Sequence, residues 1–502
     1  MAKLFNGYIV KKLLKHLSCI QQYNNSAIRQ LVKVRCFVMI FLLMTMNTLF
    51  IQTTLAQPKP TQQQLAWHNM EFYLFMHFGP NTFTDLEWGH GNEKEEVFNP
   101  TSLNCEQWCR IAKSAGAKGI IITAKHHDGF CLWPSKFSKH TVRESKWKNG
   151  NGDVLKELSV ACKKYGLKFG VYISPWDRNH PDYGTEKYNT VFVNMMKELF
   201  TNYGPIWELW WDGANGEGPN GKKQIYDWHL FEKTVKRLSP NTVVFSDIGP
   251  DIRWCGNESG IAGKTNWTYL DTAGFTRGAG APKQDTLNTG NVNGKNWIPA
   301  ECDVSIRPGW FYHEKEDDKV KTPEQLFDLY LKAVGRGANL LLNVPPNGNG
   351  LITQYDSAAL IGFKKLRDVN FRRDLARIAT IYHDDKGKPK SRPILNKKPD
   401  TVIEVDDSGD QTIHMIFAQA QKINCIVIRE DIRAGQRVGN FTINIAGKTG
   451  SKEYHYTTIG NKRILTFPAI EANSIGIEFP GIGKAVRISE LEAYLIDDHL
   501  VE

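Results

Sequence analysis

The chain has 502 residues, more than the roughly 250–300 residues at which a single hydrophobic core stops growing, so at least two domains are expected. The formal net charge is +10, but the first 56 positions contain seven basic residues and no acidic one, which leaves +3 for the remainder. A basic balance confined to one end of the chain gives no indication of a nucleic-acid-binding protein. Of the nine cysteines, seven follow residue 56 without C-x-x-C pairs. We therefore expect buried thiols, and neither a zinc site nor a disulfide framework.

Residues 1–56 predict a secretory signal peptide. Basic residues up to Arg35 precede the apolar run Cys36–Ile51, and small residues suitable for cleavage end at Ala56. A membrane anchor is the alternative, but the run is shorter than the ~20 apolar residues needed to cross a bilayer and contains Thr and Asn. The mature protein is therefore expected to be periplasmic or secreted, without stable membrane insertion.

After a Pro/Gln-rich linker that begins at Gln57, strand-like apolar runs alternate with helix-like amphipathic runs. The predicted strands are Phe72–Phe78, Gly119–Ala124, Lys168–Ser174, Ile206–Asp212, Thr242–Ile248, Trp297–Val304 and Asn339–Val344. The predicted helices are Cys105–Ala115, Val154–Tyr165, Tyr188–Tyr203, Ile225–Leu238, Pro323–Gly335 and Ser357–Val369. Such alternation is typical of parallel strands with crossover helices, and seven visible units favour a (β/α)8-like barrel over residues 57–375. No helix pattern separates Thr242–Ile248 from Trp297–Val304.

The pattern changes after about residue 378. The basic segment Lys386–Pro393 is followed by short alternating apolar runs bounded by turn residues, with no competing helix pattern. We predict an antiparallel β-sandwich over residues 390–502.

Polar side chains recur at the ends of the predicted barrel strands, where a parallel barrel forms its active site. In chain order they are His77; Lys125, His126, His127 and Asp128; Ser174, Trp176, Asp177 and Arg178; Asp212; Asp247; and Glu301 with Asp303. Because these positions converge at one end of a barrel, we expect the functional site there.

Asp212 ends the apolar strand Ile206–Asp212. Alternation puts Trp210 and Asp212 on one face and Trp211 on the other, so Asp212 lies at the barrel mouth if its face is internal. An Asp before Gly also caps turns, which is the plainer alternative. The segment GANGEGPNG that follows lacks the Lys-Ser/Thr of a phosphate loop and contains Glu217. It is predicted to be a mobile loop and not a phosphate cradle.

The residue types favour chemistry on a sugar. Neutral histidines suit hydroxyl groups, and the fourteen tryptophans supply apolar faces for pyranose rings. Glycoside hydrolysis needs one ionised and one protonated carboxyl. Asp212 is the natural nucleophile, and spacing does not choose among four candidate acids: Glu87, Asp247, Glu258 and Glu301. Glu258 stands out locally because it follows Trp254 and Cys255 on an irregular segment, apolar neighbours that favour a protonated carboxyl.

A metal site built from His126, His127 and Asp128 is an alternative. Neighbours in an extended segment point in opposite directions, however, and no H-x-H or H-x-x-E-H spacing accompanies them. We expect no metal and no cofactor.

Seven segments in chain order resemble the α-L-fucosidases of glycoside hydrolase family 29. They are MHFGPNTFTDLEWGHG, AKHHDGFCLW, VYISPWDRN, LWWDGA, RWCGNESG, PAECDVSIRPGWFYH and LLLNVPPNGNG. The SPWDRN and RWCGNE forms are similar to the subfamily that prefers α-1,3/1,4-linked fucose. The C-terminal runs are similar in pattern to galactose-binding-like modules.

The resemblance implies a retaining exo-α-L-fucosidase that acts on fucosylated oligosaccharides or glycoconjugates, with Asp212 as nucleophile and Glu258 as acid/base. The substrate-binding residues that we expect are His77, Glu87, Trp88, His126, His127 and Tyr172, together with Trp211 and Trp310 among the strand-end tryptophans. Two alternatives stay open: a non-catalytic protein that binds fucosylated glycans, and a metal-dependent hydrolase on the same barrel.

Overall fold

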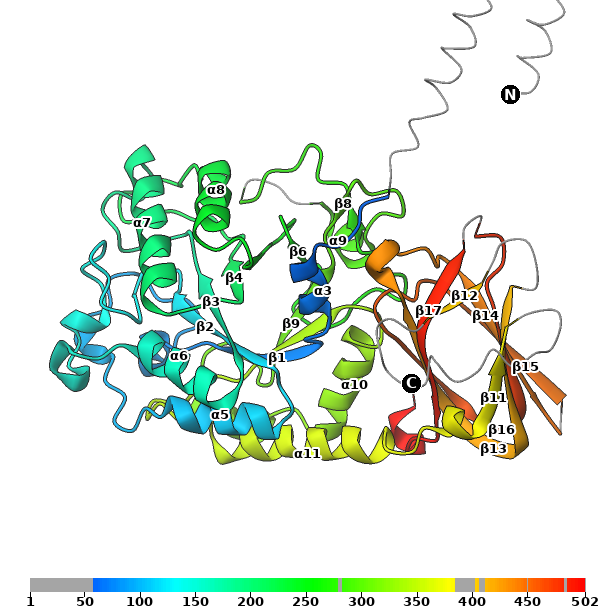
Figure 1. Cartoon of the computed structure of the whole chain (residues 1–502). Helices are drawn as coiled ribbons and strands as arrows, with labels where there is room; N and C mark the ends of the chain where they lie inside the picture. Colours follow the sequence, from blue (N-terminus) through cyan, green and yellow to red (C-terminus); the bar gives the residue numbers. More distant parts are fainter. Residues whose placement is uncertain are drawn as a thin grey trace, which may run out of the picture. The chain divides into compact units, whose positions relative to one another are not determined.

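The computed structural model describes residues 57–278, 282–383, 402–405, 411–448, 450–482 and 485–501, and the predicted signal peptide lies outside them. Eight parallel strands close into a barrel in the order β1-β10-β9-β6-β5-β4-β3-β2 (Figure 1). They are β1 (Phe72–Met76), β2 (Gly119–Lys125), β3 (Lys168–Ile173), β4 (Glu208–Trp211), β5 (Val243–Ser246), β6 (Ile252–Trp254), β9 (Ala300–Ser305) and β10 (Asn339–Asn343). An antiparallel β domain follows the barrel, so the predicted fold class is confirmed.

Helices alternate with these strands along the chain (Figure 1). They are α3 (Gln62–His68), α4 (Asn81–Thr84), α5 (Cys105–Ser114), α6 (Val154–Tyr165), α7 (Glu186–Asn202), α8 (Trp228–Leu238), α9 (Gln284–Thr289), α10 (Pro323–Ala333) and α11 (Gln354–Asn370). Long loops lead from β1 to α5 and from β2 to α6. Local chemistry sets their ends. The Asp153 side chain accepts a hydrogen bond from the Lys156 amide at the start of α6, and Gly166 ends that helix in the left-handed conformation with φ 67°.

One barrel strand, β6, was not predicted from the sequence patterns. The three-residue strand β6 follows β5 after a turn of five residues, so no helix separates the two. The predicted strand Trp297–Val304 is in fact two elements. Its first residue belongs to β8 (Asn296–Trp297), which pairs with β7 (Tyr269–Leu270) outside the barrel, and the barrel strand β9 begins only at Ala300.

Alternation along the strands separates an inner and an outer core. Trp210 packs inside the barrel with Tyr73, Phe75, Tyr172 and Phe245, whereas Trp211 belongs to the larger cluster between strands and helices. Two carboxyls lie on the barrel axis below Trp210. Glu301 accepts a hydrogen bond from Trp210 Nε1 at 2.8 Å, and Glu208 accepts one from Trp67 Nε1 at 3.1 Å. Burial raises the pKa of both, which favours a protonated, uncharged interior.

The C-terminal domain is a seven-stranded antiparallel sheet with its own core. Its strands are β11 (Ala379–Tyr382), β12 (Ile403–Val405), β13 (Thr412–Glu430), β14 (Phe441–Gly447), β15 (Gly450–Tyr456), β16 (Arg463–Glu478) and β17 (Val486–Tyr494). Several runs predicted as separate strands join into the long strands β13 and β16, whose pairing is interrupted by register shifts. The sheet also includes β11, which precedes the predicted boundary at residue 390.

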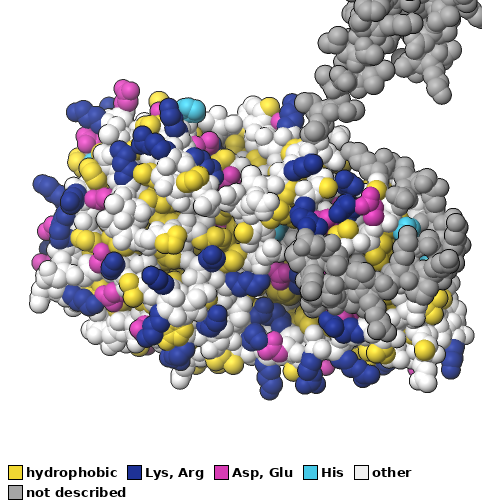
Figure 2. All heavy atoms as spheres, viewed as in Figure 1, with side chains coloured by type: hydrophobic (Ala, Val, Ile, Leu, Met, Phe, Trp, Pro, Cys, Tyr) yellow, Lys and Arg dark blue, Asp and Glu magenta, His cyan; other side chains and the backbone are white. Residues whose placement is uncertain are grey.

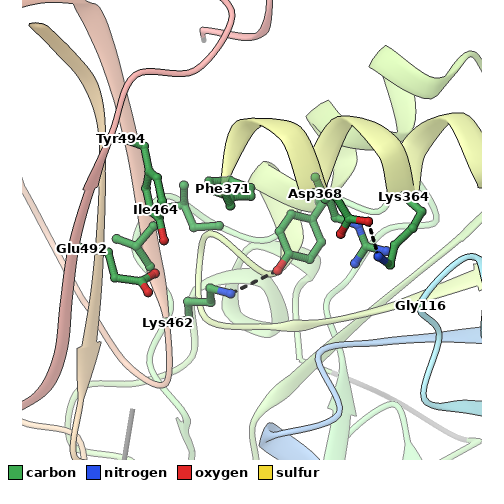
Figure 3. A pocket seen from close by; sticks show the side chains of 11 residues that line it. Gly116, Lys364, Asp368, Phe371, Lys462, Ile464, Glu492 and Tyr494 are labelled. Carbon is green, nitrogen blue, oxygen red and sulfur yellow. Dashed lines mark hydrogen bonds and ion pairs between the residues drawn. The ribbon is translucent and has the colours of Figure 1, made fainter. Parts of the chain in front are cut away.

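Charged contacts and apolar packing join the two domains. Glu71, just before β1, pairs with Arg429 of β13 and with Lys462, the residue before β16, the latter at 3.2 Å. Lys462 Nζ also donates to the Tyr330 hydroxyl of α10 at 3.0 Å. Figure 3 shows the cleft at this junction, where Tyr494 of β17 stands edge-on to Phe371 at a centroid distance of 5.3 Å. Ion pairs, a hydrogen bond and aromatic packing therefore attach the sheet to the barrel.

The distribution of charged side chains and the state of the cysteines match what the composition predicts. Figure 2 shows basic and acidic side chains interspersed over the face in view. All seven cysteines after residue 56 are buried free thiols, as expected. Within the described part of the chain, no helix combines the length and the apolar character that a membrane span requires.

Candidate active site

A cavity opens at the carboxyl ends of the barrel strands. Its volume is about 160 Å³, and it lies where a parallel barrel forms its active site. The lining residues are Phe75, His77, Glu87, Trp88, His126, His127, Tyr172, Trp210, Asp212, Ala214, Glu258, Asp303 and Trp310. Every predicted site residue except Trp211 is among them.

Asp212 follows β4 directly and accepts two hydrogen bonds. The Tyr172 hydroxyl at the end of β3 donates to Oδ2 at 2.9 Å, and the Ala214 amide donates to Oδ1 at 2.7 Å. His127 Nε2 lies 3.8 Å from Oδ2. Burial and the charge of Asp212 hold the pKa of Tyr172 well above its usual value, so its hydroxyl stays a donor. These contacts fix the direction in which the carboxylate faces.

His127 is a neutral ring with a defined tautomer. Its Nδ1 lies 2.8 Å from Ser174 Oγ, and that hydroxyl donates its only proton to the Trp176 carbonyl at 3.0 Å. Ser174 must therefore accept, and Nδ1 bears the proton. Burial lowers the pKa of His127 to about 4. Its Nε2 is left as an acceptor beside the carboxylate of Asp212.

His77 and His126 are neutral for the same reason. Burial lowers the pKa of His77 to about 3 and that of His126 well below its usual value. His77 Nδ1 lies 2.9 Å from Asn343 Oδ1, which assigns the proton to Nδ1 and leaves Nε2 as an acceptor. His126 stacks on Tyr172, and its buried Nδ1 has no hydrogen-bond partner among the described residues. Three uncharged rings thus face the cavity with unused hydrogen-bonding capacity.

Glu258 enters the cavity from the loop after β6. Trp310 Nε1 donates to Glu258 Oε2 at 3.3 Å, and the loop around Trp310 is held by Glu87. Glu87 accepts hydrogen bonds from the amides of Trp310 and Phe311, at 2.8 and 3.2 Å, and lies 2.7 Å from His313 Nε2. Glu87 therefore supports the indole that contacts Glu258.

Trp88 forms the rim of the cavity. Its side chain is 55% exposed, unusual for so large an aromatic residue. The ring stands edge-on to Trp176 and to His127, with centroid distances of 5.7 and 5.5 Å. An apolar ring held upright at the mouth suits contact with a sugar ring.

The residues of the predicted metal alternative do not converge. Asp128 Oδ1 accepts a hydrogen bond from the Phe130 amide at 2.7 Å, while His126 and His127 line the cavity. Across the described ranges, no three His, Cys, Asp or Glu side chains gather as a potential metal site.

The chain is similar in sequence to known proteins. The family model "Alpha-L-fucosidase" matches residues 53–366. The chain is 41% identical over 450 residues to alpha-L-fucosidase 1 of Arabidopsis thaliana, covering 87% of this chain and 88% of that protein. The chain belongs to the α-L-fucosidase family.

Solved structures agree. A putative α-L-fucosidase from Bacteroides thetaiotaomicron superposes on this fucosidase with a TM-score of 0.81 at 34% identity, covering 88% of this chain and 99% of that one. A Ruminococcus gnavus fucosidase of glycoside hydrolase family 29, solved in complex with fucose, gives a TM-score of 0.78 at 30% identity, covering 89% and 96%. The protein is therefore an α-L-fucosidase, a glycoside hydrolase.

Trp211 does not line the cavity, so its predicted role in substrate binding is wrong. The sequence interpretation placed it at the fucosidase site, but its side chain is 0% exposed and packs against Trp228 and Phe231 of α8. Strand alternation explains the difference, because the residue before Asp212 must point away from the barrel axis. Trp210 is the tryptophan of β4 that reaches the cavity.

The glycine-rich loop of the fucosidase is hydrogen-bonded to two aromatic side chains, and its mobility stays a prediction. Trp176 Nε1 donates to the Glu217 carbonyl at 3.0 Å, and the Tyr183 hydroxyl donates to the Gly216 carbonyl at 3.1 Å. A Cβ added to Gly216 would lie 2.1 Å from the Trp176 ring, and one added to Gly218 would lie 2.3 Å from Tyr183. These glycines allow the backbone to approach two aromatic rings closely.

The surroundings of Glu258 also differ from expectation. Glu258 is exposed at the cavity mouth, Trp254 packs against the inner core, and Cys255 is buried in the outer core. The apolar neighbours in the sequence thus do not enclose its carboxyl. Of the other candidate acids, Glu301 lies on the barrel axis beneath Trp210, and Asp247 is absent from the cavity lining.

Of the other lining residues, the sequence interpretation named Asp303 only as a strand-end polar residue, and it did not select Phe75, Trp210 or Ala214. Alternation was the available signal for three of them. Phe75 shares a face with His77, Trp210 with Asp212, and Asp303 with Glu301. Ala214 lies in the loop after β4, for which strand periodicity gives no direction.

Proposed function

We propose that this fucosidase removes terminal fucose with retention of the anomeric configuration, with Asp212 as nucleophile and Glu258 as acid/base. The observation on which this rests is that both carboxyls line one cavity at the carboxyl ends of the barrel strands. Retaining glycosidases use such a pair from the two sides of the scissile bond. The hydrogen bonds on Asp212 and the exposed position of Glu258 fit these two roles.

In the first step an oxygen of Asp212 attacks C1 of the fucosyl group while Glu258 gives its proton to the departing glycosidic oxygen. The C1–O bond to the leaving sugar breaks and a fucosyl ester of Asp212 forms. In the second step Glu258 takes a proton from water, the water oxygen bonds to C1, and Asp212 departs as a carboxylate. The Tyr172 hydroxyl, 2.9 Å from Asp212, stabilises that departing charge.

Neutral histidines provide the recognition of fucose hydroxyls. His77 and His127 present acceptor Nε2 atoms, and each keeps this tautomer because Nδ1 donates to Asn343 or Ser174. A sugar hydroxyl both donates and accepts, so it can bond an uncharged ring without bringing a charge into a closed site. Trp210 and Phe75 form an apolar floor.

We assign the preferred linkage to α-1,3/1,4-fucosylated oligosaccharides. This rests on the segments SPWDRN and RWCGNE, and Trp88 at the rim, which packs edge-on against Trp176, offers aromatic surface to the sugar that follows fucose. A digestion panel of α-1,2-, α-1,3-, α-1,4- and α-1,6-fucosylated oligosaccharides with free fucose measured tests this. Release from the α-1,2 or α-1,6 member alone would overturn the assignment.

Two variants test the roles of the carboxyls. With α-L-fucosyl fluoride and azide, Asp212→Gly is expected to form β-fucosyl azide, because azide replaces the missing nucleophile from the opposite face. Glu258→Ala is expected to form α-fucosyl azide, because azide attacks the ester intermediate. Full fucose release by both variants would contradict the proposal. A protein that binds glycans without cleaving them would release no fucose even as wild type.

For the localisation we propose secretion or export to the periplasm, on the strength of the apolar run Cys36–Ile51 and the small residues that end at Ala56. N-terminal sequencing of the protein from its native host tests this, with a mature chain that begins at Gln57 as the expected result. Retention of residues 1–56 would contradict it.

A further inference from the structure

Asp303 is a third carboxyl at the fucosidase cavity, besides Asp212 and Glu258, with no role in the mechanism above. It lies on β9 two residues after Glu301, so its side chain points to the same side of the strand, and the residue is only 5% exposed. It nevertheless lines the cavity. A buried carboxyl that borders the reacting centre needs a physical explanation.

Asp303 is tied to the strand that leads to Glu258. Trp254 Nε1 on β6 donates to Asp303 Oδ1 at 2.9 Å. Trp254 also pairs with Glu301 in the β6–β9 register, and Glu258 follows it by four residues. The Asp303–Trp254 hydrogen bond therefore fixes the start of the loop that brings Glu258 to the cavity, while Trp310 contacts Glu258 from the other side.

The electrostatics favour an uncharged Asp303. Burial and the charge of Glu258 hold the pKa of Asp303 well above its usual value. The other titratable groups around the cavity are Asp212, Glu87, Tyr172, His77, His126 and His127. The three histidines have lowered pKa values and are neutral. None of the lining residues is Lys or Arg, so an ionised Asp303 has no counter-charge there.

We propose that Asp303 is a positioning residue that works as a neutral acid: one oxygen holds Trp254, and the protonated oxygen borders the cavity without adding a second charge beside Glu258. This inference rests on the proposed role of Glu258. It implies that the proton, and not the charge, of Asp303 is what the site requires.

Asparagine is the discriminating substitution. In Asp303→Asn the amide oxygen still accepts from Trp254, and the amide N–H replaces the carboxyl O–H at nearly the same volume. We expect kcat/KM within about threefold of wild type and an alkaline limb of the pH profile in the same place. Asp303→Leu removes the acceptor for Trp254, and we expect a loss of at least about tenfold in kcat/KM.

The measurement is kcat/KM against pH for full-length wild type and both variants, with an α-1,3-fucosylated trisaccharide as substrate. If Asp303 works as a carboxylate, Asp303→Asn removes a negative charge next to Glu258, and the alkaline limb moves to lower pH by about one unit or more. That shift, or a loss above about 100-fold in Asp303→Asn, overturns the inference. Asp303→Asn remains informative even if Asp303→Leu does not fold.

The outcomes separate this inference from the proposed function. If azide rescues Glu258→Ala as α-fucosyl azide while Asp303→Asn is inactive without rescue, only the neutral-acid role fails. If azide instead rescues Asp303→Asn and has no effect on Glu258→Ala, then Asp303 is the acid/base and the assignment of Glu258 fails as well.

Discussion

The hydroxyl of Tyr172 offers the sharpest test of how the site handles charge. It donates to Asp212 Oδ2 at 2.9 Å, and the ring is buried between His126 and Trp210. In Tyr172→Phe the ring stays and only the donor is lost. Asp212 is a carboxylate before the reaction and again when the fucosyl ester is hydrolysed, so the missing donor destabilises the departing carboxylate of the second step.

A hydrogen bond to a charged group contributes about 1.5–3 kcal/mol. Since each 1.36 kcal/mol is tenfold in rate, hydrolysis of the ester is expected to slow by about 10- to 150-fold. The fucosyl ester then accumulates, so kcat and KM fall together. Stopped-flow measurement with α-L-fucosyl fluoride is expected to show a burst of fluoride close to one equivalent of enzyme, followed by slow turnover.

Tyr188→Phe is the matched control. Its hydroxyl is also buried and donates to a carboxylate, Asp177 Oδ2, at 3.0 Å, but neither residue lines the cavity. This variant is expected to lose stability while kcat stays at the wild-type value. Wild-type turnover by Tyr172→Phe, with no burst, would refute the assigned role of the hydroxyl.

Four further predictions concern pH, stability and metal. Folding lowers the pKa of His127 from 6.5 to about 4, so the unfolded chain binds the proton more tightly than the folded protein does. About 3 kcal/mol of folding stability is therefore lost as the pH falls from 6.5 to 4. Urea unfolding midpoints at pH 7, 5.5 and 4 check this, and midpoints that do not change with pH would contradict it. Burial and the charge of Asp212 raise the pKa of Asp247 from 3.8 to about 6. Wild type therefore loses about 3 kcal/mol of unfolding free energy as the pH rises from 3.8 to 6. Asp247→Asn should be more stable than wild type at pH 7.5 and equally stable at pH 3.5. Glu71→Gln leaves Arg429 and Lys462 without their shared carboxylate and should cost about 3 kcal/mol in unfolding free energy, with kcat/KM of the folded protein unchanged. Dialysis against EDTA should leave kcat/KM at its starting value, whereas loss of activity restored by a divalent cation would favour the metal-dependent alternative.

The fold followed from the sequence wherever periodicity was long enough. Runs such as Gly119–Lys125 are buried along their whole length, as expected for strands covered on both faces. The three residues of β6 are too few to show the alternation of a strand, and no helix separates β6 from β5 to indicate a new strand. The length of β13 was not predictable for another reason. The residues in its middle are polar and suggest a loop, but in the structure they pair with β16 across register shifts.

The site was predictable to different degrees for different residues. Asp212 directly follows β4 and His77 directly follows β1, so the barrel itself places them at the mouth. Trp211 was misassigned because aromatic composition was given more weight than alternation, which pointed to Trp210. Glu258 lies on a loop, and its approach to the cavity depends on the Trp310 indole, 52 positions away along the chain. Local patterns contain no information about such a contact, and family resemblance supplied the assignment.

The central claim is a covalent fucosyl ester on Asp212. Incubation with 2-deoxy-2-fluoro-α-L-fucosyl fluoride, followed by proteolysis and mass spectrometry, tests it directly, because the fluorine slows hydrolysis of the ester more than its formation. The account predicts one added fluorofucosyl group on the peptide that contains Asp212, and no label in Asp212→Gly. A label on another carboxyl, or β-fucose as the first product of wild-type hydrolysis, would contradict it.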